Sequence, residues 1–432
     1  MSVGRLMLRA GRRSRVRRAV TRYRCARRAQ RMPASRQSRT GLDWTNFFIA
    51  DVQAGFGAFV AFYLAGLGWS QSSVGLALSA GGLAGVLGQI PGGALADAVR
   101  FKRALVATGI VTICSAAIIL ALIPTFTLVF AAEILHGLTA GLVTPALSAI
   151  SLGLVGRRAM SARTGRNFRF AAFGTALTAG VLGLVGHFVS ARSIFLAAAG
   201  LCAPALIALA RIRADEIDYA RARNAGTGEA AGKWHRVRDL ARNRGLLLFA
   251  ACLILFQLAN ASMLPLVGEN LVASKAAYAS VRMSGLIIGP QIVVALLAPW
   301  VGYFSELRGR KPLLLLGMGL EAVRAVLFAF VADYPLLVAI QLLDGVSGAI
   351  ISVLTVLVIT DLTTGTGRFN LAQSAIGTGT GIAAALSTSI FGFVFQLFGY
   401  SAGFLSIAGV AAVAVALAWL FLPETKPEKY ID

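Results

Sequence analysis

Two apolar segments of the sequence contain side chains that could bind and release a proton. Asp51 lies a short way into the first segment, and Glu133 and His136 lie in the fourth. Glu133 and His136 are three positions apart, so they share one helix face and could hold a proton between them. A charge at the centre of a membrane helix costs roughly 2.5 to 3.5 kcal/mol and needs a partner or a wet cavity. We interpret Asp51 as a substrate or proton site, or else as a structural pair or cap. The alternative for Glu133 and His136 is a neutral buried hydrogen bond.

A second charged cluster is predicted from its position around a turn. Arg324 lies ten residues before Tyr334, the centre of a short polar turn, and Asp344 lies ten residues after it. At 1.5 Å per residue both lie about 15 Å from the turn, so two adjacent antiparallel helices could pair them. Glu321, one turn deeper, could compete for Arg324. The cluster predicts either an exchange of partners during function or a static pair that neutralises buried charge.

The chain repeats itself at a spacing of about 209 residues. Residues 93–105 read GALADAVRFKRAL and residues 302–314 read GYFSELRGRKPLL, so glycine, a small residue, an acid and a basic cluster recur in order. The same offset aligns Asp51 with Asn260, which follows Gln257 by three positions. We therefore predict two halves built on one plan, with Asn260 and Gln257 as further candidates for binding.

The composition places the chain in a lipid bilayer. Of its 432 residues 57% are hydrophobic and only 14% are charged, and the mean hydropathy is +0.75, which leaves too little polar surface for a water-soluble protein. A helix needs roughly 20 apolar residues to cross ~30 Å of hydrocarbon, and the sequence contains twelve such segments. They begin near Asn46, Val74, Ala104, Thr127, Phe168, Arg192, Leu246, Met283, Pro312, Leu336, Asn370 and Ser401. We predict an all-α membrane protein with twelve transmembrane helices.

Lysine and arginine fall mainly in every second loop between these segments. Cytoplasmic loops hold the excess of these residues, so we predict a multi-pass protein of the inner (plasma) membrane with both termini in the cytoplasm. The expected parts are a leader (residues 1–45), a first half (46–212), a cytoplasmic linker (213–245), a second half (246–422) and a cytoplasmic tail (423–432). We interpret the linker as a tether between the halves, or as an ordinary solvated loop.

The leader carries most of the excess positive charge. Fourteen arginines lie between Arg5 and Arg39, and the net charge of +23 falls to +9 when they are set aside. A basic segment beside a bilayer is typical of an orientation signal or of contact with anionic lipid, so nucleic acid is not the expected partner. Two alternatives are a true start at Met32 and an organellar targeting segment.

The sequence gives no sign of an enzyme or of a bound cofactor. The four cysteines and three histidines are not spaced for a metal or redox site, and no GxxxxGK[ST] motif for nucleotide binding is present. The buried acids are the groups that could respond to a proton gradient across the bilayer. Glycines at residues 81, 85, 88 and 92, and at 377, 379 and 381, predict close packing between helices.

The repeated loop resembles a motif of the major facilitator superfamily. That motif, G-x-L-A-D-R-x-G-R-K between the second and third helices, is matched here by Gly93, Leu95, Ala96, Asp97 and Lys102. The first copy is eroded, since Ala98, Arg100 and Phe101 replace the motif's Arg, Gly and Arg. The second copy keeps residues 309–311 as Gly-Arg-Lys but has Glu306 in place of the acid.

The resemblance implies a fold and a gate. The fold is two pseudo-symmetric six-helix bundles with the transport path between them, in which Asp51 and Asn260 would face each other across a cavity. The gate would lie on the cytoplasmic side, where simple anchoring by basic residues is the alternative. Its expected residues are Gly93, Asp97, Lys102, Arg103, Gly302, Glu306, Arg308, Arg310 and Lys311.

The resemblance further implies secondary transport of a small solute by alternating access, in a monomer, with proton coupling and with export favoured over uptake. Two departures weaken parts of this reading. Glu133 stands four residues before Gly137, where many proton-coupled members have an arginine, and the fifth segment lacks the Gly-Pro-x-x-Gly-Gly pattern of drug/proton antiporters. The alternatives are an uncoupled or uptake facilitator and, in another class, a non-transporting receptor or assembly partner.

Overall fold

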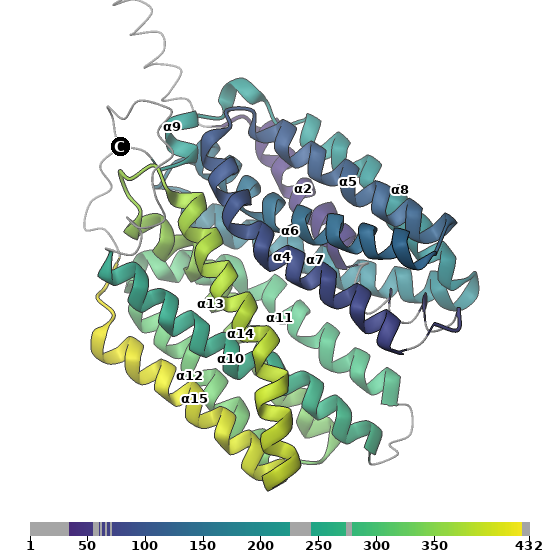
Figure 1. Ribbon diagram of the computed structural model, residues 1–432. Coiled ribbons are helices and arrows are strands. Elements are labelled where there is room, and N and C mark those ends of the chain that lie inside the picture. The colour runs from purple at the N-terminus through teal and green to yellow at the C-terminus, as the bar shows by residue number, and fades with distance from the viewer. Residues whose placement is uncertain are drawn as a thin grey trace, which may run out of the picture.

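The computed structural model describes residues 34–54, 60, 63–64, 67–69, 71–224, 243–273 and 279–425. Residues 1–33, with most of the predicted leader and Met32, lie outside the described residues. The described chain is almost entirely helical and forms two halves (Figure 1). The first half contains α2 (Arg36–Ala54), α4 (Gln71–Ala98), α5 (Lys102–Leu122), α6 (Phe126–Val155), α7 (Met160–Phe188) and α8 (Ala191–Ala210).

The second half contains six long helices as well. These are α10 (Arg244–Ala273), α11 (Ala279–Arg308), α12 (Lys311–Phe330), α13 (Tyr334–Leu362), α14 (Phe369–Phe398) and α15 (Tyr400–Phe421). Between the halves lie the short η1 (Ala214–Glu216) and α9 (Tyr219–Ala222). Ten helices of the described chain, all the long ones except α2 and α4, are long and apolar enough to cross a membrane. The predicted all-α membrane fold is confirmed.

Most helices begin within four residues of the expected positions, but α2 and α7 begin well before them. α2 starts at Arg36, inside the predicted leader, and α7 starts at Met160 rather than near Phe168. The first turns of both helices are polar, so a search for apolar runs misses them. Asp43 of α2 is buried and pairs with Arg163 and Arg166 of α7, and this pairing allows charged turns to pack against each other.

Glycines let α4 and α6 approach closely, as their spacing predicted. A Cβ added at Gly92 would lie 2.8 Å from the carbonyl oxygen of Gly141, and one at Gly81 would lie 2.8 Å from the carboxylate of Glu133. One added at Gly137 would meet the carbonyl oxygen of Gly81. The two helices therefore touch along their backbones, and any larger side chain here would force them apart.

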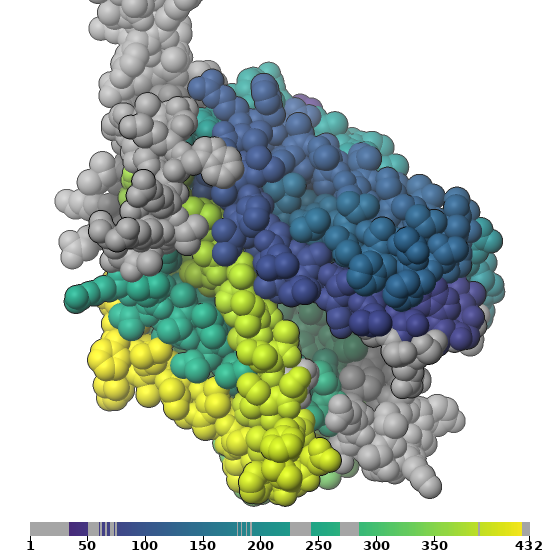
Figure 2. All heavy atoms as spheres, viewed as in Figure 1, coloured from purple at the N-terminus to yellow at the C-terminus, as the bar shows by residue number. Residues whose placement is uncertain are grey.

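The two halves touch near one end of the molecule and separate towards the other. α4 and α14 are side by side near α9 and diverge away from it (Figure 1), and Figure 2 shows a hollow between their far parts. α7 and α11 form the second contact between the halves. We call the end that carries α9 the basic end, because the loops at residues 99–101, 156–159, 309–310 and 363–368 there hold most of the arginines between the described helices.

Candidate functional site

Two equivalent close contacts join the halves at the basic end. A Cβ added at Gly93 of α4 would meet the hydroxyl of Ser374 in α14, and one added at Gly302 of α11 would meet the carbonyl oxygen of Ser161 in α7. Gly93 and Gly302 are the repeat counterparts found in the sequence. Each copy of the repeat therefore places a glycine of one half against the start of a helix in the other half. Gly93 lies against α14, and Gly302 lies against α7.

Asp97, beside the first contact, binds the beginning of α14. Its carboxylate accepts hydrogen bonds from the Asn370 side chain at 2.6 Å and from the backbone N–H of Leu371 at 2.9 Å. The first N–H groups of a helix have no partner within it, and the helix dipole favours a negative charge at that position. Asp97 thus caps a helix of the opposite half and ties the two halves together.

Glu306, the counterpart of Asp97, lies in a denser network. Its carboxylate accepts a hydrogen bond from the Ser161 hydroxyl at the start of α7, and it pairs with Arg310 at 3.0 Å. Arg310 is almost fully buried and also reaches Asp361 at the end of α13, at 3.2 Å. The carboxylate of Glu424 accepts from the backbone N–H of Arg310 at 2.8 Å and so caps α12.

The other predicted gate residues take different positions. Lys102 is buried and donates to the carbonyl oxygen of Ala96, and Arg103 donates to that of Ala210 at 3.2 Å. Arg308 lies over the ring of Phe304. The backbone N–H of Lys311 donates to Glu424 at 3.1 Å. Lys102 and Arg310 thus have specific buried partners, which simple anchoring at a membrane surface does not require.

The described part of the predicted linker is not a loose tether. We call residues 213–224 the strap. The Tyr219 hydroxyl donates to the carbonyl oxygens of Asp97 and Ala98 at 3.1 and 3.0 Å, and Lys102 lies over its ring. Asn224 is buried, and its side chain donates to the carbonyl oxygen of Thr360 in α13 at 2.6 Å. The strap therefore holds the motif loop of the first half and the end of α13 in the second.

The beginning of the strap is fixed to the start of the first half. Glu216 accepts hydrogen bonds at 3.0 Å from both the N–H and the hydroxyl of Ser35, just before α2. Burial alone would raise the pKa of Glu216, but hydrogen bonds from Ser38 and Ser35 and the charge of Arg213 outweigh it and hold that pKa below its usual value. Glu216 is thus a carboxylate at neutral pH and keeps these bonds.

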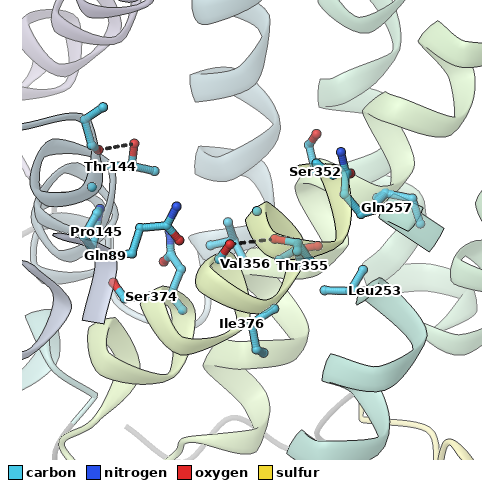
Figure 3. A pocket seen from close by; sticks show the side chains of 18 of the residues that line it. Gln89, Thr144, Pro145, Leu253, Gln257, Ser352, Thr355, Val356, Ser374 and Ile376 are labelled. Atoms are coloured by element: carbon cyan, nitrogen blue, oxygen red, sulfur yellow. Dashed lines mark hydrogen bonds between the residues drawn. The ribbon is translucent and has the colours of Figure 1, made fainter. Parts of the chain in front are cut away.

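A cavity of about 470 Å³ lies between the halves, beyond the contacts at the basic end. Helices α4, α6 and α7 line it from the first half, and α10, α13 and α14 from the second. In Figure 3 Gln89 and Thr144 lie on one side of this space, and Gln257 and Ser352 lie on the other. Its polar lining residues are Gln89, Thr144, Gln257, Ser352, Thr355, Gln373, Ser374 and Thr380.

A second cavity of about 200 Å³ adjoins the first and shares Thr144, Phe168, Val356 and Gln373 with it. None of the described residues lining either cavity has an ionisable side chain. Apolar walls are supplied by Phe168 and Phe256, among others. The volume of the larger cavity is that of a typical small-molecule site. Its wall combines apolar surface with a few polar groups, as the walls of such sites do.

The predicted charged cluster forms in the second half, away from the cavity wall. Arg324 of α12 pairs with Glu321 at 2.7 Å and with Asp344 of α13, so the expected Arg324–Asp344 pair is confirmed. Arg324 also donates to the side-chain oxygen of Asn260 of α10 at 2.5 Å. Side chains of Arg324 and Glu321 are 2% and 0% exposed, whereas that of Asp344 is 27% exposed. One guanidinium thus joins three helices.

Asn260 therefore differs from the expectation that it would face Asp51 across a cavity. It turns to Arg324 and lines neither cavity, whereas Gln257, one turn away on α10, lines the larger one. The reason is rotational, because residues three apart point in directions about 60° apart on a helix. The side chain of Asp51 lies outside the part of the chain whose side chains are described, so its role stays a prediction.

Glu133 and His136 both lie on α6, in its first three turns. Glu133 is buried and faces Gly81 of α4, and His136 is half-buried. Neither residue lines the two cavities. A shared proton between them stays a prediction.

Comparison with known proteins decides the family. A family model described as the Major Facilitator Superfamily matches residues 43–290 and 246–431. The chain belongs to the major facilitator superfamily. This family consists of membrane transporters, so the chain is a transporter rather than an enzyme.

Two curated relatives agree with this assignment. They are the uncharacterized MFS-type transporters MT2531 and Rv2456c of Mycobacterium tuberculosis, strains CDC 1551 / Oshkosh and ATCC 25618 / H37Rv. Each is 37% identical over 389 residues, which cover 89% of this chain and 93% of the relative. The identity is high enough to show common family membership over nearly the whole length.

Two solved structures share the fold of this superfamily member. A mutant of the nucleoside transporter NupG matches with a TM-score of 0.63, covering 89% of this chain and 99% of NupG. FucP, a Major Facilitator Superfamily transporter in the outward conformation, matches with a TM-score of 0.67, covering 89% of this chain and 98% of FucP. Sequence identity is 16% in both cases, so the likeness concerns the fold.

Sequence reasoning missed much of the transporter's central site. It selected mainly charged residues and, of the cavity residues, only Gln257. The other polar groups of the described cavity wall are amides and hydroxyls, such as Gln89, Gln373 and Ser352. Glutamines inside apolar segments are a usable signal, because an amide without a hydrogen bond is costly in hydrocarbon. The strap had no comparable signal, since Tyr219 and Asn224 lie in an ordinary polar stretch.

Proposed function

We propose that the chain is a secondary active transporter that moves a small solute across the inner membrane by alternating access, coupled to protons. The observation that carries the proposal is the cavity lined by six helices, three from each half. A solute bound there contacts both halves, so its binding energy can favour one arrangement of the two bundles over another.

The basic loops support a cytoplasmic position for the basic end and for both termini. With this orientation, the contacts at Gly93, Gly302 and Asp97 close the cytoplasmic side, and the cavity is on the outer side of them. The arrangement supports an outward-facing state. We further propose that the transporter is a monomer and that its basic leader contacts anionic lipid. FucP in the outward conformation has the same fold.

Proton coupling is supported by the charge of the Arg324 cluster. One guanidinium faces two carboxylates, Glu321 and Asp344. Two carboxylates cannot both be neutralised by one cation, and an uncompensated buried charge is costly. One oxygen of Glu321 is buried with no hydrogen-bond partner among the described residues, so it has room for a proton. Glu321 and Asp344 are the proposed proton carriers, because a proton on one leaves the other paired with Arg324.

The substrate and direction are tested together. We would compare the metabolites of cells and medium between a strain that lacks this chain and one that overproduces it. We expect a compound that is retained by the first strain and expelled by the second, because we favour export. A compound left unconsumed in the medium by the first strain would reverse the direction to uptake. No difference under several growth conditions would favour a non-transporting receptor.

The coupling is tested with the purified protein in liposomes. Transport of the identified compound should rise when a pH gradient is imposed, and Glu321→Gln should remove that response. Asp215→Asn is the matched control, because the Asp215 side chain is 71% exposed and pairs only with Arg213 in the strap. Transport that ignores the gradient in the unmodified protein would establish an uncoupled facilitator.

A further inference from the structure

The central cavity presents hydrogen-bonding groups that no neighbouring side chain uses. Gln89 of α4, Gln257 of α10, and Ser352 and Thr355 of α13 line it, and each is half-buried. Within the described part of the chain these four side chains have no hydrogen-bond partner. Polar groups in a protein interior are normally paired. These groups are therefore available to a ligand or to water that a ligand displaces.

The described residues that line the two cavities carry no charge. In the described chain both cavities are lined only by uncharged side chains, and Arg324, Glu321 and Asp344 bind one another away from the cavity wall. A transporter that works by alternating access closes around its ligand, which then loses most of its water. An ionised ligand without a counter-charge would be strongly disfavoured in that state.

The polar groups also define what a neutral ligand must carry. A glutamine amide both donates and accepts hydrogen bonds, and so does a hydroxyl. Gln89 and Gln257 belong to opposite halves, so a ligand with such groups at two ends can bind both at once. Phe168 and Phe256 add apolar surface on the same wall.

We infer that this cavity binds an uncharged small molecule whose hydroxyl or amide-type groups bridge Gln89 and Gln257, with an apolar or ring face against the phenylalanines. The inference rests on the proposed function and adds the substrate class to it. Sugars and nucleosides are two sources of this chemistry. Organic anions, amino acids and cationic drugs would find no counter-charge among the described lining residues.

Ligand binding can be tested without knowing the compound. Water-soluble metabolites of bacterial cells are separated by ion exchange into neutral, anionic and cationic fractions, and each is added to the purified full-length protein. Thermal unfolding is then followed by tryptophan fluorescence. We expect the neutral fraction alone to raise the melting temperature, since a ligand that binds only the folded state stabilises it. Stabilisation by a charged fraction, or by none of the three, overturns the inference.

Pure compounds and variants complete the test. Neutral and charged forms of each compound class are compared. For sugars, neutral glucose is compared with gluconate and glucosamine, and for nucleosides, neutral uridine is compared with uridine monophosphate. Gln257→Leu and Thr355→Val should weaken the apparent affinity about tenfold each, because each removes one hydrogen bond. Thr112→Val is the matched control, since Thr112 is half-buried on α5, lines neither cavity and donates only to its own helix. Equal affinity in Gln257→Leu and the unmodified protein would contradict the assigned wall.

The outcomes separate this inference from the proposed function. Binding is measured without any gradient, so proton coupling does not affect it. If the ligand is neutral and its transport does not respond to a pH gradient, the inferred substrate class stands and the proposed proton coupling is refuted. A charged ligand whose transport follows the pH gradient would do the reverse.

Discussion

Arg324 joins three helices of the second half. It is buried between Glu321 and Asp344 and also holds Asn260. Arg324→Ala would leave the buried Glu321 carboxylate and the partly exposed Asp344 carboxylate without a cation, and removing one partner of a buried ion pair typically costs about 3–5 kcal/mol. We expect a marked fall in the melting temperature of the purified Arg324→Ala protein. The melting temperature of Glu321→Gln should fall less, because Arg324 and Asp344 remain as a one-to-one ion pair. Equal melting temperatures for Arg324→Ala and the unmodified protein would show that the cluster is not buried as described.

The same residues show how far the sequence leads. Equal depth on two helices indicated that Arg324 and Asp344 could pair, because depth follows from counting residues along a straight helix. Whether the two side chains face each other did not follow from depth. The partner of Asn260 could not be predicted in this way. It depends on how α10 is rotated about its axis, and packing of the whole half sets that rotation. Of the cavity amides the sequence selected Gln257, through the repeat, but missed Gln89 and Gln373, which carry no charge that must be neutralised.

At the scale of elements, the start of α14 depends on a carboxylate from the opposite half. Asp97→Asn removes the charge from this cap, and a hydrogen bond to a charged group is worth about 2 kcal/mol. We expect the ratio of molecules closed at the basic end to molecules open there to fall roughly thirtyfold. Spin labels on cysteines at residues 100 and 364, with the native cysteines replaced, should then report an added longer distance. Asp215→Asn should leave the distances unchanged, and no change in Asp97→Asn would contradict the role of the cap.

The strap is a second element whose contribution can be isolated. Asn224 has a left-handed backbone, with φ of 60°, which a glycine adopts freely but an alanine resists by about 1–2 kcal/mol. Asn224→Gly removes only the side-chain hydrogen bonds to α13, and Asn224→Ala adds strain. The Gly365 amide donates to the backbone carbonyl of Asn224. We expect hydrogen exchange at this amide to be fastest in Asn224→Ala, slower in Asn224→Gly and slowest in the unmodified protein. Identical exchange in all three proteins would mean that the strap does not hold the second half.

Sequence reading predicted the positions of most elements but not their contacts. Apolar runs locate a helix wherever its ends are apolar, so α2 and α7 were placed late because their first turns carry Asp43, Arg163 and Arg166. The repeat located both copies of the gate motif and did not indicate that Asp97 would cap α14. Such a contact is made between the halves, and no local pattern records it.

For the whole molecule, alternating access requires that the two ends move in opposite senses. The close contacts at Gly93 and Gly302 hold the basic end together, while the halves diverge at the other end. If each half moves largely as a rigid body, closing the far end must open the basic end. Labels at residues 125 and 332, in exposed loops of the far end, should therefore come closer in the same population in which labels at residues 100 and 364 move apart.

This reciprocal change is the prediction that most directly tests the mechanism. Both distances would be measured on one protein preparation at neutral and acid pH, with and without the neutral metabolite fraction. We expect acid pH and the ligand each to shift the populations of the two conformations. If transport is coupled, protons and the ligand each bind the two conformations with different affinity. Glu321→Gln should remove the response to pH and keep the response to ligand. Distances that shorten at both ends together would indicate compaction of the whole protein, and would rule out rocking of the two bundles as the basis of transport.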